Sequence, residues 1–441
     1  MPAGGELLRY GLAELLCGLG LAPVWTRRGD AQIVVAVEPA GGGLALPVTD
    51  RALADLCAPR RPAVADLGWA ELEGERWPVP VGPVGESEAR GDRIAAAAWW
   101  LAGLQERAAS ARDRHGRFPY AESLQAALGD GPGGPLRPAV DATRRWLAEA
   151  LHAHGIGTAP RTWGGAAWAV ALTHDLDAVR TRRLRALAGE IRRGRPADAL
   201  RRALGPDRRR ASIGALHALA ERHGAAATWF VKPGAWTPHD VPGGLDPSLV
   251  GRLRRWEAEG HEVGWHPGYG TLGRPDRLAT EAERFRAALG HPPALARTHF
   301  LRWADETPRA LAALGVRVDS TLGFAERPGF RRGTAHPFRL FDLDADRPTD
   351  LWEVPLAAMD TTLAEHLGLG ADGVGDALRS VFEAARRSGG VAVVLWHNQV
   401  GADTAGWGGG VDALDHALGQ ARADGARLGP LGALLAGWEG G

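Results

Sequence analysis

The feature of this sequence that most constrains the fold is a regular alternation of short apolar runs and helical stretches beginning near Gly165. Seven apolar runs are long enough to form strands: residues 167–173, 226–231, 261–266, 294–300, 316–322, 351–356 and 391–397. Segments rich in Ala, Leu, Arg and Glu with helical spacing lie between most of them. Strand–helix alternation indicates a parallel α/β sheet or barrel. We therefore predict a distorted seven-stranded (β/α) barrel over residues 161–441.

The first 160 residues lack this alternation, and we predict that they form a separate, smaller α/β domain. Residues 32–37 have the pattern of a strand and residues 94–107 that of a helix, with Pro and Gly between them. The segment Arg114-His-Gly-Arg-Phe-Pro119 is typical of a loop before a helix. No chemistry can be derived from this region, and its role stays open.

Composition excludes several classes of function. The 52 basic residues balance 52 acidic ones, so neither nucleic acid nor an acidic membrane surface is an expected partner. With only Cys17 and Cys57, the chain has neither a disulfide scaffold nor a CxxC metal site. It has no apolar stretch of about 18 residues, and residues 1–25 do not resemble a signal peptide, so we expect a cytoplasmic protein without a transmembrane segment. The oligomeric state is not indicated.

Unusual polar residues occur at the ends of five predicted strands. The carboxyl ends of barrel strands converge on one face, so these residues are expected to lie together. Packing alone does not explain them, because each buried titratable group would need a partner. The five segments are Thr173-His-Asp-Leu-Asp177, His261-Glu-Val-Gly-Trp-His-Pro267, Arg297-Thr-His-Phe-Leu-Arg-Trp303, Asp319-Ser-Thr321 and Leu395-Trp-His-Asn398.

Asp175 and Asp177 are two residues apart on an extended segment, so their side chains point the same way. Such a pair can divide its roles, one carboxylate binding a cation and the other taking a proton. The alternative for Asp177 is a helix N-cap. His266 ends the third predicted strand and is a candidate Zn²⁺ ligand. The alternative is a structural histidine. His261 is interpreted as structural.

His397 closes the last strand and suits a proton donor. His299 is a candidate metal ligand or polariser of the substrate. The adjacent Arg297 and Arg302 suit an anionic or polyhydroxylated ligand, or could orient the carboxylates. No serine nucleophile elbow, phosphate-binding loop or dinucleotide fingerprint is present in the sequence.

These segments resemble the motifs of the polysaccharide deacetylases, also called NodB-homology proteins or carbohydrate esterase family four. Thr173-His-Asp-Leu-Asp177 resembles their first motif with one residue between the acids, and Gly260-His-Glu-Val-Gly-Trp-His266 their second. Arg297-Thr-His299 keeps the arginine of the third motif, and His397 matches the last. The resemblance covers about residues 165–398 and implies a barrel of seven parallel strands. By it, Asp175 would be the general base, His397 the general acid, and Asp177 and His266 metal ligands.

The resemblance is incomplete at the metal site. The family has a second histidine four residues after His266, where this chain has Gly270. A Zn²⁺ site with two protein ligands is one short of the usual three. We expect His299, or Asp175 itself, to complete it.

The whole chain resembles a bacterial subgroup in which an uncharacterised N-terminal region precedes the deacetylase domain. The features that carry this resemblance are Arg114-His-Gly-Arg-Phe-Pro119, His266-Pro-Gly-Tyr269, Arg297-x-His-Phe-Leu-Arg302 and Gly329-Phe-Arg-Arg-Gly-Thr334. Within them, Tyr269, Arg302 and Arg332 are candidate substrate-binding residues. Trp303 is a further candidate for binding substrate. For both Tyr269 and Trp303, packing in an aromatic core is an equal alternative.

The expected function is metal-dependent hydrolysis, removing acetyl groups from an N-acetylated or O-acetylated sugar or polysaccharide. The cofactor implied is a divalent metal such as zinc. Two alternatives remain open: a non-catalytic carbohydrate-binding protein on a degenerate deacetylase fold, and a metal-dependent amidase acting on a non-sugar C–N bond.

Overall fold

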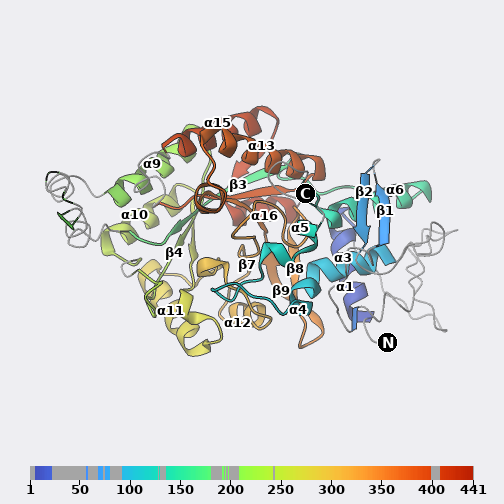
Figure 1. The fold of residues 1–441 in the computed structure, drawn as a ribbon, viewed down its shortest axis with the longest axis horizontal. Helices are drawn as coiled ribbons and strands as arrows, with labels where there is room; N and C mark the ends of the chain where they lie inside the picture. The colour runs from blue at the N-terminus through green and yellow to red at the C-terminus, as the bar shows by residue number, and fades with distance from the viewer. Residues whose placement is uncertain are drawn as a thin grey trace.

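The centre of the computed structural model is a curled sheet with helices around it and a helical N-terminal region beside it (Figure 1). The structure describes residues 5–21, 56–57, 68–72, 75–79, 92–127, 129, 136–179, 191–192, 194, 197, 208–241, 244–398 and 408–440. The strand predicted at residues 32–37 lies outside this part of the chain. Within it, no helix is long and apolar enough to cross a membrane.

The described strands of the large sheet follow the order β10-β11-β3-β4-β5-β6-β7-β9-β8, with β12 pairing beside β3. Every pairing is parallel except that of β8 with β9. Each predicted apolar run overlaps a strand, while β8 and β12 fall outside the predicted runs. The strands are β3 Ala169–Leu176, β4 Thr228–Val231, β5 Glu262–Trp265, β6 Leu295–Ala296, β7 Val318–Asp319, β8 Phe338–Asp342, β9 Arg347–Glu353, β10 Leu356–Met359, β11 Val391–Leu395 and β12 Arg427–Gly429.

The connection from β9 to β10 makes the sheet curl. The predicted run at 351–356 is two strands, which pair with β7 and with β11 at distant places in the strand order. Only Val354 and Pro355 separate them. Three peptide steps span at most about 11 Å, so the two regions of the sheet must approach each other. This geometry confirms the predicted distorted (β/α) barrel.

The helices lie outside the sheet, and several begin and end at residues suited to those positions. The Asp246 side chain accepts a hydrogen bond from the Leu249 amide at the start of α10, and Gly290 ends α11 with a φ of 89°. These are the cap and the left-handed terminus that favour Asp and Gly. The barrel helices are α9 Arg208–Arg222, α10 Pro247–Ala258, α11 Pro275–Leu289, α12 Thr307–Ala312, α13 Ala371–Ser388, α15 Gly408–Ala423 and α16 Leu431–Glu439.

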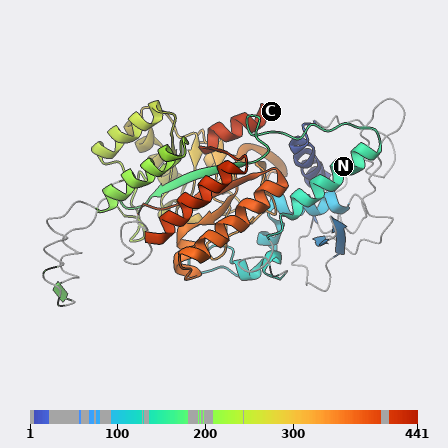
Figure 2. The same cartoon turned by 90° about the horizontal axis from the view of Figure 1, so that it is seen from above.

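The N-terminal region packs on the β8–β9 side of the barrel, to the right in Figures 1 and 2. Its buried apolar side chains join those of the barrel in one continuous cluster, and the Tyr10 hydroxyl donates to the Arg339 carbonyl at 2.6 Å. The domain boundary at residue 160 stays a prediction. The elements are α1 Gly5–Gly18, the antiparallel pair β1 Gly68–Leu72 and β2 Glu75–Val79, α3 Asp92–Ala102, α4 Leu104–Ala108, α5 Leu124–Ala127 and α6 Ala139–Ala153.

Glu14 on α1 predicts how stability depends on pH. Burial raises the pKa of its carboxyl from 4.5 to about 7, while its Oε2 accepts the Arg339 amide at 3.2 Å. Between those pH values the folded chain keeps a proton that the unfolded chain releases, so stability falls as pH rises through this window. The resulting decrease in the free energy of unfolding between these pH values is at most about 3 kcal/mol, and we expect Glu14→Gln to abolish it. Urea unfolding at pH 4.5 and pH 8 measures it. Exposed Glu149→Gln is the control, and an unchanged pH dependence in Glu14→Gln would contradict the account.

Candidate active site

The strand ends bring the predicted centre together, as the register of the sheet requires. Val231 pairs with both Leu176 and Trp265, and Trp265 pairs with Ala296. The residues that follow these positions therefore lie at one level at the carboxyl edge of the sheet. A pocket of about 280 Å³ opens there, and the predicted residues Asp175, Asp177, His266, His299 and His397 all line it.

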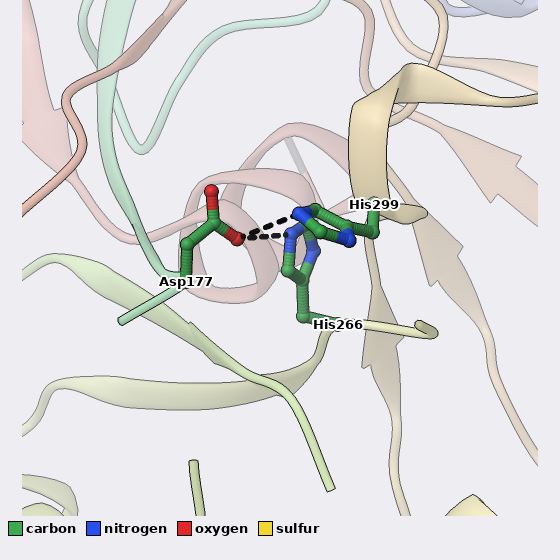
Figure 3. A group of neighbouring side chains, drawn as sticks. All are labelled: Asp177, His266 and His299. Atoms are coloured by element: carbon green, nitrogen blue, oxygen red, sulfur yellow. Dashed lines mark ion pairs between the residues drawn. The ribbon is translucent and has the colours of Figure 1, made fainter. Parts of the chain in front are cut away.

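Asp177, His266 and His299 form a group whose ligand atoms converge (Figure 3). Asp177 Oδ1 lies 3.1 Å from His266 Nε2 and 3.3 Å from His299 Nε2. Ligands of a tetrahedral Zn²⁺ at bond lengths of about 2.0–2.1 Å are roughly 3.3 Å apart. The spacing therefore suits one divalent cation with an open fourth position.

The partners of the two histidines decide which ring nitrogen is available. His266 Nδ1 donates to the Arg297 carbonyl at 2.5 Å, and His299 Nδ1 donates to Asp240 Oδ1 at 3.0 Å. A neutral ring then presents a lone pair at Nε2, and both lone pairs face Asp177. Such an outer hydrogen bond fixes the tautomer of a metal-ligating histidine. This donor set fits a metal, and Asp240, which the sequence analysis missed, orients one of its members.

The charges in this group also suit a cation. Burial by itself raises the pKa of Asp177, yet His299 and Lys232 beside it hold that pKa well below its usual range. Burial lowers the pKa of His299, yet Asp177 and Asp240 raise it above its usual value. The carboxylates thus favour positive charge between themselves and the rings, which a divalent cation would supply.

Position 270 has no room for the histidine that the family has there. A Cβ atom there would lie 2.7 Å from Trp236 Cβ and 2.9 Å from Thr237 Cγ2. These distances are too short, so the backbone at this position is packed against the 236–237 loop. The third ligand must come from elsewhere, and His299 lies where a third ligand is needed.

Asp175 is held by Arg297, whose predicted contact with substrate is corrected by the structure. The Arg297 side chain is fully buried, and its Nη1 donates to Asp175 Oδ1 at 3.1 Å and to Thr173 Oγ1 at 2.8 Å. Its Nε donates to the Ser320 carbonyl and its Nη2 donates to the Ser320 hydroxyl. Arg297 therefore orients the carboxylate of Asp175. The other carboxylate oxygen, Oδ2, lies 3.7 Å from His266 Nε2.

His397 is paired with Asp360, a residue that the sequence analysis missed. Asp360 Oδ1 lies 2.6 Å from His397 Nδ1, and its Oδ2 accepts the His397 amide at 2.6 Å. Burial alone would lower the pKa of His397, but Asp360, Asp177 and Asp175 raise it to about 10. The imidazole is then a cation at neutral pH, as a proton donor must be. Its Nε2 lies 3.7 Å from Asp177 Oδ2.

The Asp360→Asn variant tests this pairing. An asparagine can accept only one of the two hydrogen bonds from His397, and it lacks the charge that raises the pKa of the ring. We expect the alkaline limb of the kcat/KM profile to move down by at least about one pH unit. Asp376→Asn, on the surface of α13, should leave the profile unchanged. An alkaline limb that stays in place would contradict the pairing.

Of the other predicted substrate contacts, Trp303 and Arg332 are corrected. Both line a small recess apart from the pocket, and Arg332 is buried, pairs with Glu106 at 3.1 Å and packs on Gly103. Tyr269 and Arg302 line a second pocket of about 160 Å³, which shares His299 with the first. Their contact with substrate stays a prediction.

The N-terminal region contributes a wall of the pocket, which its sequence did not indicate. Arg114, His115 and Arg117 line the pocket together with the residues of the strand ends. Arg117 pairs with Asp113 at 2.7 Å and donates to the carbonyl of Phe300 at 3.2 Å. The segment Arg114–Pro119, predicted as a loop, is thus tied to the 299–301 turn beside a candidate ligand.

A second group of possible ligands, His217, Glu221 and His261, does not suit a metal. His261 Nδ1 accepts hydrogen bonds from the Ala227 amide at 3.0 Å and the Trp229 indole at 3.2 Å. Its Nε2 must then carry the hydrogen, which faces Glu221 at 3.4 Å. This agrees with the interpretation of His261 as structural.

Comparison with known proteins gives matches among solved structures. No family model matches the chain, and no curated protein matches it. A structure described as a polysaccharide deacetylase from Mycobacterium smegmatis matches with 20% identity and a TM-score of 0.44, covering 63% of this chain and 91% of that one. Puue allantoinase matches with 14% identity and a TM-score of 0.44, covering 63% and 92%.

A third structure, described as a polysaccharide deacetylase from Pseudomonas aeruginosa, matches with 14% identity and a TM-score of 0.43, covering 62% of this chain and 92% of that one. With identities and TM-scores this low, the function of this chain has to be inferred from its own side chains. The chain is thus similar to solved structures described as polysaccharide deacetylases, the family that its motifs resemble.

Proposed function

We propose that this protein is a metal-dependent hydrolase that removes acetyl groups from an N-acetylated or O-acetylated sugar. The observation that carries the proposal is one pocket holding three convergent ligand atoms, a separate carboxylate and a cationic imidazole. Ligands, base and acid are the three parts that hydrolysis of an unreactive acyl bond needs.

The residues divide the work as follows. Asp177, His266 and His299 would hold the metal, which when bound would polarise the acetyl carbonyl and lower the pKa of a water molecule. Asp175, fixed by Arg297, takes a proton from the attacking water. His397, charged by its contact with Asp360, gives a proton to the leaving nitrogen or oxygen. His115, His239 and Phe300, whose ring centroids are 4.6–5.6 Å apart, also line the pocket and offer aromatic contacts for a sugar ring.

Acetate release from acetylated amino sugars and acetylated oligosaccharides tests the proposal. We expect release by the zinc-loaded chain and none after chelation. Saccharide binding without hydrolysis would favour the carbohydrate-binding alternative. Hydrolysis confined to non-sugar amides would favour the amidase alternative.

A further inference from the structure

Lys232 is the only lysine in the sequence, and it lies in the candidate active site. It directly follows Val231, so the sheet register sets it between Asp177 and His266. Its side chain is 1% exposed. The mechanism proposed above gives it no task.

Among the described residues, every recorded polar contact of the Lys232 ammonium group is long. Its nearest recorded partners are the two ring nitrogens of His299, at 3.4 and 3.5 Å. One of these donates its hydrogen to Asp240, and the other faces Asp177 as a candidate ligand atom. The carboxylate oxygens of Asp177 and Asp240 are 3.7 and 4.0 Å from Nζ.

Within the described residues, then, no recorded carboxylate contact of Lys232 is shorter than 3.7 Å. A buried ammonium that is poorly paired is costly, and three N–H donors need acceptors. Because Lys232 lines the pocket, a molecule bound there can supply the acceptor.

We propose that Lys232 is an oxyanion-binding residue, which holds the charged oxygen of the reacting acetyl group and then the carboxylate of the acetate product. This rests on the proposed deacetylation. As the water oxygen bonds to the acetyl carbon, Asp175 takes its proton and the π electrons of the carbonyl move onto the oxygen, which accepts a hydrogen bond from Nζ. The electrons return when the bond to the leaving group breaks. His397 protonates that group, the acetic acid formed releases its proton to water to become acetate, and the proton held by Asp175 returns to His397 through solvent.

The first test compares Lys232→Met with Arg379→Met, which removes a positive charge from the exposed face of α13. Acetate is titrated calorimetrically into the zinc-loaded full chain, and metal content and kcat are measured on the same samples. We expect Lys232→Met to keep its metal, to bind acetate at least about tenfold more weakly, and to lose about 10²–10³-fold in kcat. Arg379→Met should match the wild type. A Lys232→Met protein that keeps its metal and its wild-type acetate affinity would overturn the proposal.

The second test needs no variant and holds even if Lys232→Met fails to fold. In protein labelled with ¹⁵N-lysine, one side-chain signal reports on this one amine. We expect added acetate to shift it saturably, and no shift would overturn the role of Lys232. A shift in a protein that hydrolyses no acetylated compound would support acetate binding and reject deacetylation. Hydrolysis without a shift would reject only the role of Lys232.

Discussion

The Asp175→Asn variant should lose at least about 10³-fold of its acetate-releasing activity while keeping its metal. Asparagine preserves the shape of the side chain and can still accept the hydrogen bond from Arg297, now 3.1 Å long. It cannot take a proton from water. The carboxylate of Asp175 is also outside the group of three candidate ligands, so metal content should not change.

Asp141→Asn is the matched control for this variant. Asp141 is also buried and paired with an arginine, at 2.6 Å from Arg144, but it lies on α6 away from the pocket. Its replacement should lower stability and leave kcat of the folded enzyme unchanged. Activity retained in Asp175→Asn would remove Asp175 as the base, and metal lost from it would make Asp175 a ligand.

The second large effect is expected for His299→Ala, which should lose both metal and activity. A tetrahedral site that falls from three protein ligands to two loses much of its affinity. Altering the outer partner of a ligand typically costs about 10- to 100-fold in affinity, and removing the ligand itself should cost more. Zinc competition with a chromogenic chelator measures the change.

Asp240→Asn provides the graded comparison for His299→Ala. It keeps an acceptor for His299 Nδ1 but removes the charge, so its loss of zinc affinity should be the smaller of the two. Full zinc occupancy and activity in His299→Ala would exclude His299 as the third ligand.

The strand ends could be predicted from the sequence because apolar runs in parallel sheets have a strong pattern and their carboxyl ends meet at one edge. That reasoning placed Asp175, Asp177, His266, His299 and His397 in one pocket. It misses Asp360 because the pattern at 351–356 predicts a single strand. Asp360 directly follows β10, a strand on the far side of the β9–β10 connection.

Asp240 and Lys232 had weaker signals. Asp240 lies in the irregular segment after β4, and it reaches His299 across 59 residues of sequence, which no periodicity reveals. Lys232 is the only lysine in the sequence and directly follows the strand predicted at 226–231, but no motif in the sequence marks it as part of the site.

The predicted substrate contacts near residue 300 depended on closeness in sequence. Phe300 and Leu301 have φ values of 63° and 54°, a left-handed turn that reverses the chain directly after His299. Neither Arg302 nor Trp303 therefore lines the pocket that holds Asp175, Asp177 and His397: Arg302 lines the second pocket beside His299, and Trp303 lines the small recess. A backbone conformation of this kind in non-glycine residues has no reliable sequence signal.

The central claim is that Asp177, His266 and His299 form one metal site that the proposed hydrolysis requires. Elemental analysis of the purified full chain after zinc loading and removal of free metal tests it most directly, with Asp177→Ala and His266→Ala analysed beside the wild type. We predict one zinc ion per wild-type chain and none in either variant. A wild-type chain that retains no metal yet releases acetate, or variants that retain the same ion, would contradict it.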